Sequence, residues 1–295
     1  MRKLFKQLGT TLMAATLATA IQAEPLVIGG KNFTEQQLLT EMTAQYLDKQ
    51  GYDIERRAGM GSAVLRKAQE NAQIDLYWEY TGTSLLVYNK VKEQIADPQK
   101  VYEKVRELDA KKGLTWLNPS SANNTYALAM RNEDADAKGI NTLSDLAKAL
   151  NDGQELTLAT NAEWYSRKDG YKELKKAYDF DIPRSDIKRM DSGLTYVALK
   201  EGQVDIALVF ATDGRIPAFN FRVLEDDKGF FPNYAITPVV RDEVLKANPN
   251  LSEQLNNLSA QLDNDTMSAL NAKVDVDRMS IEDVAAEFLT AKGLL

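Results

Sequence analysis

The sequence predicts a mixed α/β protein of two similar lobes. Strand-like and helix-like segments alternate along the chain, and a helix–aspartate–strand pattern occurs twice, 130 positions apart. The 295 residues, 44% of them hydrophobic, would supply core for one large or two medium domains. These observations together favour two lobes of like architecture.

The predicted fold opens with a strand, a glycine-containing loop and a helix. The strand is expected at residues 26–28, and Thr34 is expected to cap the helix, with Gln37 completing a capping box. Gly51 is expected to end the helix. An apolar stripe at helical spacing supports this assignment: Leu38, Leu39, Met42, Tyr46 and Leu47.

The repeated pattern occupies residues 62–82 and 192–214. Each copy runs from a serine through a helix-like stretch to an aspartate, Asp75 or Asp205, and then into a strand. A similar unit is expected at 143–160, and the part from about Arg241 onward is expected to be helical.

Each predicted strand of the repeat ends in an aromatic residue, Tyr80 in the first copy and Phe210 in the second. Ligands of open α/β sheets lie outside the carboxyl ends of the strands, so two such ends facing one another would form a cleft. The alternative is that the pattern is generic to α/β folds and that both rings only cover their cores.

The first 23 residues predict a cleavable signal peptide. Basic residues at positions 2, 3 and 6 precede the apolar stretch 12–21, which is too short to span a bilayer, and cleavage is expected after Ala23. The chain has no cysteine, so a lipid-bearing N-terminal thiol and disulfides are excluded. We therefore expect a periplasmic protein that is not a lipoprotein.

Charge and composition argue against several functions. Removing the signal peptide takes the formal charge from −7 to −10, which disfavours nucleic acid or an anionic membrane as a partner. The chain has neither histidine nor cysteine, so it lacks the commonest general base, the thiol nucleophile and the best zinc ligands. We expect no metal, no cofactor and no enzymatic activity.

Three tyrosines lie among turn formers or small polar residues: Tyr80, Tyr126 and Tyr234. Aromatic residues in such settings often reach the wall of a cleft, and Phe210 has the matching position in the second repeat. A group of π-faces attracts a quaternary ammonium, which has no hydrogen to donate. For any single tyrosine, half-buried packing is the simpler interpretation.

A zwitterionic ligand also needs a partner for its carboxylate. Lys31 precedes the first predicted helix, and Arg167 follows the strand expected to end at Thr160, so both are expected at the rim of the cleft. Taken alone, each would be interpreted as a solvated surface charge.

Four stretches of the sequence resemble one family. They are Gly30-Lys31-Asn32-Phe33-Thr34-Glu35-Gln36, Asp75-Leu76-Tyr77-Trp78-Glu79-Tyr80-Thr81-Gly82-Thr83, Asn124-Thr125-Tyr126-Ala127-Leu128 and Thr212-Asp213-Gly214-Arg215-Ile216. As a set they are similar to the signature stretches of the glycine betaine/carnitine/choline-binding proteins of osmoprotectant ABC importers, the ProX/OsmF type. The resemblance covers essentially the whole chain after the signal peptide.

The resemblance implies a type II periplasmic-binding-protein fold, with two α/β lobes joined by two crossing segments and a ligand cleft between them. Lobe I would comprise residues 24–124 and 235–295, and lobe II residues 125–234. The chain would be a monomer that delivers a small quaternary amine to the membrane permease of an ABC transporter.

The resemblance also implies a set of ligand-binding residues. The ammonium cage would be formed by Tyr80, Tyr126, Phe210 and Tyr234, with Phe210 where the family often has tyrosine. The carboxylate-binding residues would be Lys31, Thr83 and Arg167. Further possible contacts are Asn124, which stands where some members have aspartate, Trp164 and Tyr165.

Several alternatives remain open at the level of the sequence. The ligand could be choline, which has no carboxylate, or an amino acid, which has no quaternary centre. A hydrolase using carboxylates such as Glu79 is disfavoured, because Glu79 and Tyr80 point to opposite sides of a strand. A transcription regulator shares the lobe design, but the expected signal peptide and the lack of DNA-binding helices argue against it.

Overall fold

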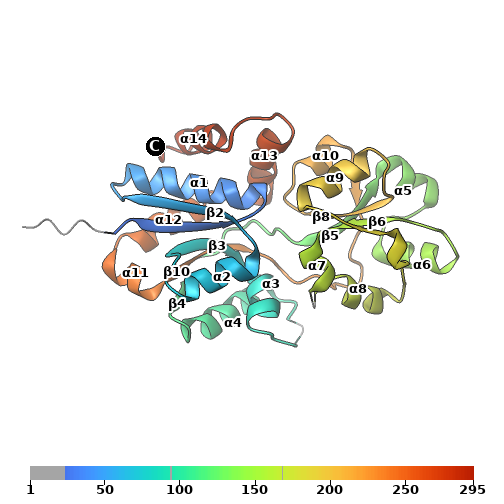
Figure 1. Cartoon of the computed structure of the whole chain (residues 1–295), viewed down its shortest axis with the longest axis horizontal. Helices are drawn as coiled ribbons and strands as arrows, with labels where there is room; N and C mark the ends of the chain where they lie inside the picture. Colours follow the sequence, from blue (N-terminus) through green and yellow to red (C-terminus); the bar gives the residue numbers. More distant parts are fainter. Residues whose placement is uncertain (1–23, 94, 168) are drawn as a thin grey trace, which may run out of the picture.

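The computed structural model describes residues 24–93, 95–167 and 169–295, which form two α/β lobes side by side (Figure 1). The predicted fold class is therefore confirmed. The expected signal peptide, residues 1–23, lies outside the described residues.

The first lobe is built on a five-stranded sheet in the order β2-β1-β3-β10-β4, in which β1 is parallel to β2 and β3, and β10 is antiparallel to β3 and β4. Its elements are β1 (Leu26–Lys31), α1 (Thr34–Lys49), β2 (Ile54–Met60), α2 (Ser62–Glu70), β3 (Leu76–Tyr80), α3 (Thr81–Thr83), the π-helical η1 (Ser84–Tyr88), α4 (Pro98–Ala110), β4 (Leu114–Trp116), β10 (Ile236–Arg241), α11 (Asp242–Ala247), α12 (Leu251–Ser259), α13 (Asn264–Asp275) and α14 (Ile281–Ala291).

The second lobe has a sheet in the order β7-β6-β8-β5-β9, in which β6 is parallel to β7 and β8, and β5 is antiparallel to β8 and β9. Its elements are β5 (Tyr126–Arg131), α5 (Asn132–Lys138), α6 (Leu143–Asn151), β6 (Leu158–Thr160), α7 (Ala162–Ser166), α8 (Tyr171–Tyr178), the 3₁₀ turn η2 (Arg184–Asp186), β7 (Ile187–Arg189), α9 (Ser192–Lys200), β8 (Ile206–Phe210), α10 (Arg215–Ala218) and β9 (Phe221–Val223).

The two sheets share one layout, and the repeated aspartates have the same role in each. Asp75 accepts a hydrogen bond from the backbone N–H of Val27 at 2.8 Å, and Asp205 accepts one from Thr157 at 2.8 Å. Each carboxylate thus joins the strand it precedes to the neighbouring parallel strand. The repeat in the sequence therefore reflects a shared scaffold, in which β3 and β8 end at Tyr80 and Phe210 as predicted.

The start of α1 differs from the prediction. Its N-cap is Phe33, without a side-chain cap, and the hydroxyl of Thr34 donates instead to Asp275 Oδ1 at 2.8 Å on α13. The tertiary contact with a segment 241 residues away replaces the local capping box. The end of the helix agrees with expectation, because Gly51 follows it with a φ of +93°.

Two segments cross between the lobes and run beside one another. They are antiparallel at the bridge between Asn123 and Ala235, and the N–H of Asn124 donates to the carbonyl of Tyr234 at 3.2 Å. The lobe boundaries predicted at residues 124–125 and 234–235 fall in these crossing segments and stay a prediction.

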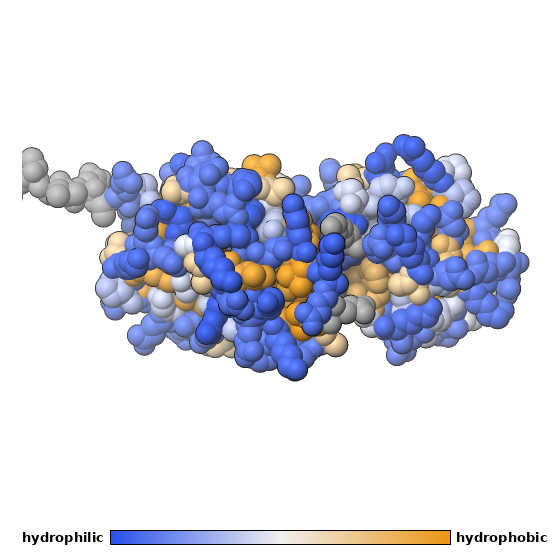
Figure 2. Space-filling view, turned by 90° about the horizontal axis from the view of Figure 1, so that it is seen from below, coloured by the Kyte–Doolittle hydropathy of each residue, from blue (hydrophilic) through white to orange (hydrophobic). Residues whose placement is uncertain are grey.

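The surface is mostly polar on the face seen in Figure 2, where hydrophobic atoms gather near the junction of the lobes. Val64 of α2 is the most exposed large hydrophobic residue in the described part of the chain, at 63%. None of the described helices has the length and apolar character needed to cross a membrane.

A buried ion pair anchors α2 to α4 in the first lobe. Arg66 donates to both carboxylate oxygens of Asp109, at 2.6 and 2.9 Å, and Ser84, Asn89 and Trp116 donate to the same carboxylate. Burial alone would raise the pKa of Asp109, but the hydrogen bonds and charge of Arg66 outweigh it and lower the pKa to about 2.

We expect Asp109→Asn to destabilise the protein by about 3 kcal/mol, because it leaves the buried Arg66 charge without its main partner. Urea unfolding would measure the loss. Asp97→Asn is the matched control on the same helix, because asparagine caps as well as aspartate there. The difference from wild type should shrink as the pH falls from the ordinary value of 3.8 toward 2, where Asp109 takes up its proton.

Candidate functional site: the cleft between the lobes

A cleft of about 970 Å³ lies between the lobes, at the carboxyl ends of the central strands. Lys31 ends β1, Tyr80 ends β3 and Phe210 ends β8, and all three side chains line it. The cleft wall includes all seven residues predicted for the cage and the carboxylate, and also Asn124: Lys31, Tyr80, Thr83, Asn124, Tyr126, Arg167, Phe210 and Tyr234.

Five aromatic rings form a continuous row through the cleft. Phe33 stacks on Tyr80, with ring centroids 6.2 Å apart, and on Phe210, at 5.2 Å. Phe210 then contacts Tyr126 at 5.2 Å, and Tyr126 meets the edge of Tyr234 at 5.5 Å. Tyr126 and Phe210 are also directly opposite one another on β5 and β8. The row joins the two lobes, because Phe33 and Tyr80 come from the first and Phe210 and Tyr126 from the second.

Phe33 was not predicted as a site residue, although a signal was available. It follows Lys31 by two residues, and its neighbour Asn32 is a turn former, the same setting that singled out the tyrosines. Its place beside Phe210, in contrast, depends on how the lobes meet.

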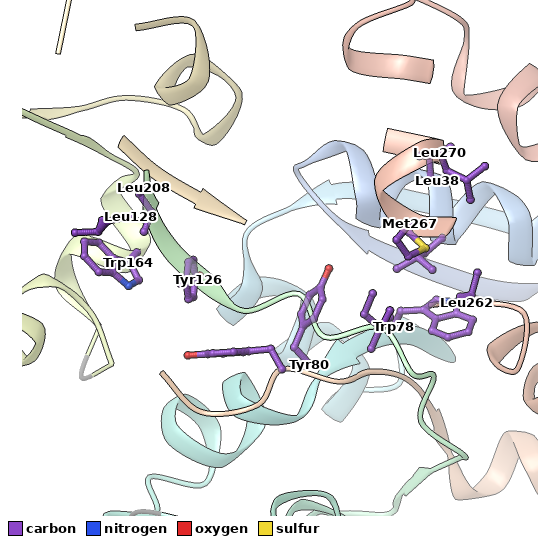
Figure 3. Close-up of a cluster of buried hydrophobic side chains, with 14 of the residues drawn as sticks. Leu38, Trp78, Tyr80, Tyr126, Leu128, Trp164, Leu208, Leu262, Met267 and Leu270 are labelled. Carbon is purple, nitrogen blue, oxygen red and sulfur yellow. The ribbon is translucent and has the colours of Figure 1, made fainter. Parts of the chain in front are cut away.

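Trp164 and Tyr165 do not lie on the cleft wall. Trp164 is fully buried behind Tyr126, at 6.3 Å between ring centroids, on the side away from Tyr80 (Figure 3). Tyr165 stacks on Tyr171 at 5.5 Å. Both rings thus pack within the second lobe in this structure, and a contact of either with the ligand stays a prediction.

Lys31 is buried and forms an ion pair. Its Nζ lies 2.5 Å from Oε1 of Glu79 and 4.7 Å from the centre of the Tyr80 ring. Glu79 is fully buried and does not line the cleft, and its second oxygen accepts from Tyr77. An ammonium group has three donors, so the pair leaves Lys31 able to donate into the cleft.

Arg167 forms a second buried ion pair on the opposite lobe. Its Nε and Nη2 donate to Asp169 at 2.7 and 2.5 Å, and its guanidinium lies 5.3 Å from the centre of the Tyr126 ring. Both Nη1 and Nη2 also approach the hydroxyl of Thr83 across the cleft, each at 3.5 Å. Asp169 also accepts a hydrogen bond from the hydroxyl of Tyr234. The two predicted carboxylate-binding cations are therefore both neutralised and both beside rings of the row.

The charges that line the cleft nearly balance. Among the described lining residues, four are cationic and five anionic: Lys31, Arg167, Arg189 and Arg215, and Glu35, Glu163, Asp191, Asp213 and Asp275. Such a wall suits a zwitterion or a monocation better than an anion.

Glu35 is the centre of a buried network that the sequence did not reveal. Its Oε1 accepts from the hydroxyl of Tyr80 at 2.7 Å and from Nδ2 of Asn124 at 2.6 Å. Its Oε2 accepts from the hydroxyl of Thr212 and, at 3.4 Å, from Nδ2 of Asn271. An acidic residue in the first turn of a helix is ordinary, and the four donors come from distant segments, so no local pattern predicts the network.

Burial raises the pKa of Glu35 above its ordinary value of 4.5, against the opposing effect of the four donors. The group is also without an ion pair among the described residues. The folded protein thus holds the proton of the Glu35 carboxyl group more tightly than the unfolded chain does. The stability that this protonation contributes is complete below pH 4.5 and is lost as the pH rises through the raised pKa.

We expect the difference in melting temperature between wild type and Glu35→Gln to change with pH in one direction. The uncharged glutamine does not titrate, so wild type should lose stability relative to the variant as the pH rises from about 4.5. Thermal unfolding of both proteins between about pH 4 and 8 would measure it. A relative gain of wild type on raising the pH would contradict the raised pKa.

Two α/β lobes with a cleft between the carboxyl ends of their strands define a two-lobed substrate-binding protein. Residues 24–291 match the family model described as the substrate-binding domain of ABC-type glycine betaine transport systems. The chain belongs to this family, which acts in transport outside the cytoplasm and is not a class of enzymes.

Similar proteins have related descriptions. The chain is 46% identical to a glycine-betaine-binding protein of Pseudomonas aeruginosa, over 96% of this chain and 92% of the relative. It is 36% identical to an ergothioneine transport permease/ergothioneine binding protein of Helicobacter pylori, over 93% of this chain and 49% of the relative. A crystal structure described as a glycine betaine/carnitine/choline ABC transporter superposes with a TM-score of 0.75 at 31% identity, covering 91% of this chain and 99% of the other.

Proposed function

We propose that this protein binds a small quaternary-ammonium zwitterion, such as glycine betaine, in the cleft and delivers it to the permease of an ABC importer. The observation that carries the proposal is the row of five rings, which has a buried, neutralised cation at Tyr80 and another at Tyr126. The balanced charge of the wall supports a ligand without net charge.

The rings would hold the trimethylammonium group. A cation is attracted to a ring when it lies within about 6 Å of the ring centre, and each desolvated contact contributes up to about 2 kcal/mol. Phe33 and Phe210 touch across the lobes at 5.2 Å, so the ligand would part this stack as it enters. Tyr80, Tyr126, Phe210 and Tyr234 would then form the cage, with Phe33 as a fifth wall.

Lys31, Thr83 and Arg167 would hold the carboxylate. Each cation keeps its partner, Glu79 or Asp169, so the ligand would add to a neutral pair and would not have to balance a bare buried charge. Thr83 and Arg167 come from opposite lobes, and a carboxylate between them would favour closure of the cleft.

We also propose the cellular setting. The basic residues and apolar stretch within 2–21 support export by a signal peptide cleaved after Ala23. The absence of cysteine from the sequence supports a protein without a lipid anchor, which would act as a monomer in the periplasm and dock on the membrane permease.

A ligand screen would test the proposal. We expect glycine betaine, carnitine, proline betaine or ergothioneine to raise the melting temperature, because a ligand that binds only the folded state stabilises it by mass action. Glycine, which shares the carboxylate but has no methyl groups, is the matched control and should give a much smaller shift. Equal shifts for glycine and glycine betaine, or no shift with any quaternary amine, would refute the cage.

A double variant separates betaine from choline. Arg167→Gln with Asp169→Asn removes the guanidinium but leaves the net charge of the site unchanged, and the amide oxygen introduced at position 169 still accepts from Tyr234. We expect the double variant to weaken the binding of glycine betaine by about tenfold or more. The binding of choline, which has no carboxylate, should stay nearly unchanged. Calorimetry would measure both, and an equal loss for the two ligands would exclude Arg167 as the carboxylate contact.

A further inference from the structure

We propose that Glu35 is a positioning residue that holds the two lobes together through Thr212 and thereby sets the spacing of the aromatic row. The part that concerns the row rests on the proposed function, whereas the contact between the lobes does not. Neither residue was predicted from the sequence as part of the site.

The contact crosses the cleft. Glu35 lies in the first turn of α1, and Thr212 follows β8 in the second lobe, yet the hydroxyl of Thr212 donates to Oε2 of Glu35. Nδ2 of Asn271, on α13 of the first lobe, donates to the carbonyl of Thr212 at 2.9 Å. Thr212 is 1% exposed and Glu35 3% exposed, so water does not compete for these bonds.

Three of the four partners of Glu35 are tied to a ring of the row. Tyr80 is itself one of the rings, and Asn124 precedes Tyr126 by two residues. Thr212 follows Phe210 by two residues, and Phe33 precedes Glu35 by two. One carboxyl group thus fixes the rings of the first lobe, the start of the crossing strand and the ring of the second lobe relative to one another.

Neighbouring contacts support the same closed arrangement. Arg215 pairs with Asp275 at 3.3 Å, again between the lobes. Gly214 packs so closely on α13 that an added Cβ would lie 2.5 Å from the carbonyl oxygen of Ser268 and 2.5 Å from the Cβ of Ala272. The second lobe therefore approaches the first here as closely as only a glycine allows.

Every donor and acceptor of this contact belongs to the chain itself. The lobes can therefore close through it without a ligand, and a protein that is already closed loses less of its binding free energy to the conformational change. Removing the contact should both open the unliganded protein and weaken ligand binding.

The distance between the lobes would test the proposal directly. Two spin labels would be attached at Lys100→Cys on α4 and Lys138→Cys on α5, both at exposed positions. Because the chain has no cysteine of its own, only these two sites would be labelled. Double electron–electron resonance would be measured without ligand on wild type, Thr212→Val and the control Thr195→Val. Thr195 is also a buried threonine near the cleft, but its hydroxyl donates only to Ser192 and Leu208 within the second lobe.

We expect Thr212→Val to move the distance distribution to longer values and Thr195→Val to leave it unchanged. Calorimetry should show that Thr212→Val binds glycine betaine about tenfold or more weakly than wild type. This is the loss expected for one hydrogen bond to a carboxyl group when that bond forms only in the closed protein. The proposal would be overturned if Thr212→Val had the same distance distribution as wild type. It would also be overturned if the variant only melted at a lower temperature, with no change in the distance between the lobes.

A second variant covers the case in which Thr212→Val does not fold. Gly214→Ala changes none of the residues that bond to Glu35 but adds a methyl group against α13, and it should also lengthen the distance between the labels. If no quaternary amine binds wild type, the proposed function fails, while the distance measurement still decides whether Glu35 and Thr212 hold the lobes together. If amines bind wild type and the distances do not change in either variant, only this inference fails.

Discussion

The pairing of the two crossing segments is the constraint on which the site depends. Asn123 and Ala235 form an antiparallel bridge, and Asn124 and Tyr234 share a backbone hydrogen bond. Because the two connections run together, the carboxyl ends of β1, β3 and β8 line one cleft. Tyr126 and Tyr234 lie at the ends of the crossings themselves, so two rings of the row are placed directly by the hinge. A change in hinge angle would therefore alter the ring contacts as well as the width of the cleft.

Burying the two cations that flank the row of rings is tolerable because each is neutralised within its own lobe. Lys31 has Glu79 in the first lobe, and Arg167 has Asp169 in the second. Opening the cleft therefore breaks no strong ion pair at its centre, and closing it does not require two bare charges to lose water together. Among the described residues, the polar contacts that cross the cleft are hydrogen bonds and one partly exposed ion pair, Arg215 with Asp275, whose rupture costs less. The stacked rings of Phe33 and Phe210 add an apolar contact. This division would suit the closure of the cleft that we propose.

The sequence predicted those features that depend on local pattern. Alternating elements, the helix–aspartate–strand repeat and the aromatic ends of β3 and β8 are all visible in short windows, and all are present in the structure. The capping box at Thr34 was wrong, because Asp275, 241 residues away, takes the hydroxyl. The role of Glu35 could not be predicted for the same reason, since it depends on four hydrogen-bond donors in four distant segments. Local pattern therefore gives the scaffold and the position of the cleft, and long-range contact decides which side chains act inside it.

The two copies of the repeat also differ in the ring that ends the strand, which is tyrosine in the first lobe and phenylalanine in the second. Tyr80 and Phe210 end equivalent strands, but only Tyr80 has a hydroxyl, and that hydroxyl donates to one oxygen of Glu35. The other oxygen is already served from the second lobe by Thr212, two residues beyond Phe210. Phe210 stacks on Phe33 instead, at 5.2 Å, and a ring used only for its face needs no polar group to be satisfied. The carboxyl group of Glu35 thus accepts from one hydroxyl of each copy of the repeat, Tyr80 in the first and Thr212 in the second, and it joins two similar scaffolds through chemically different positions.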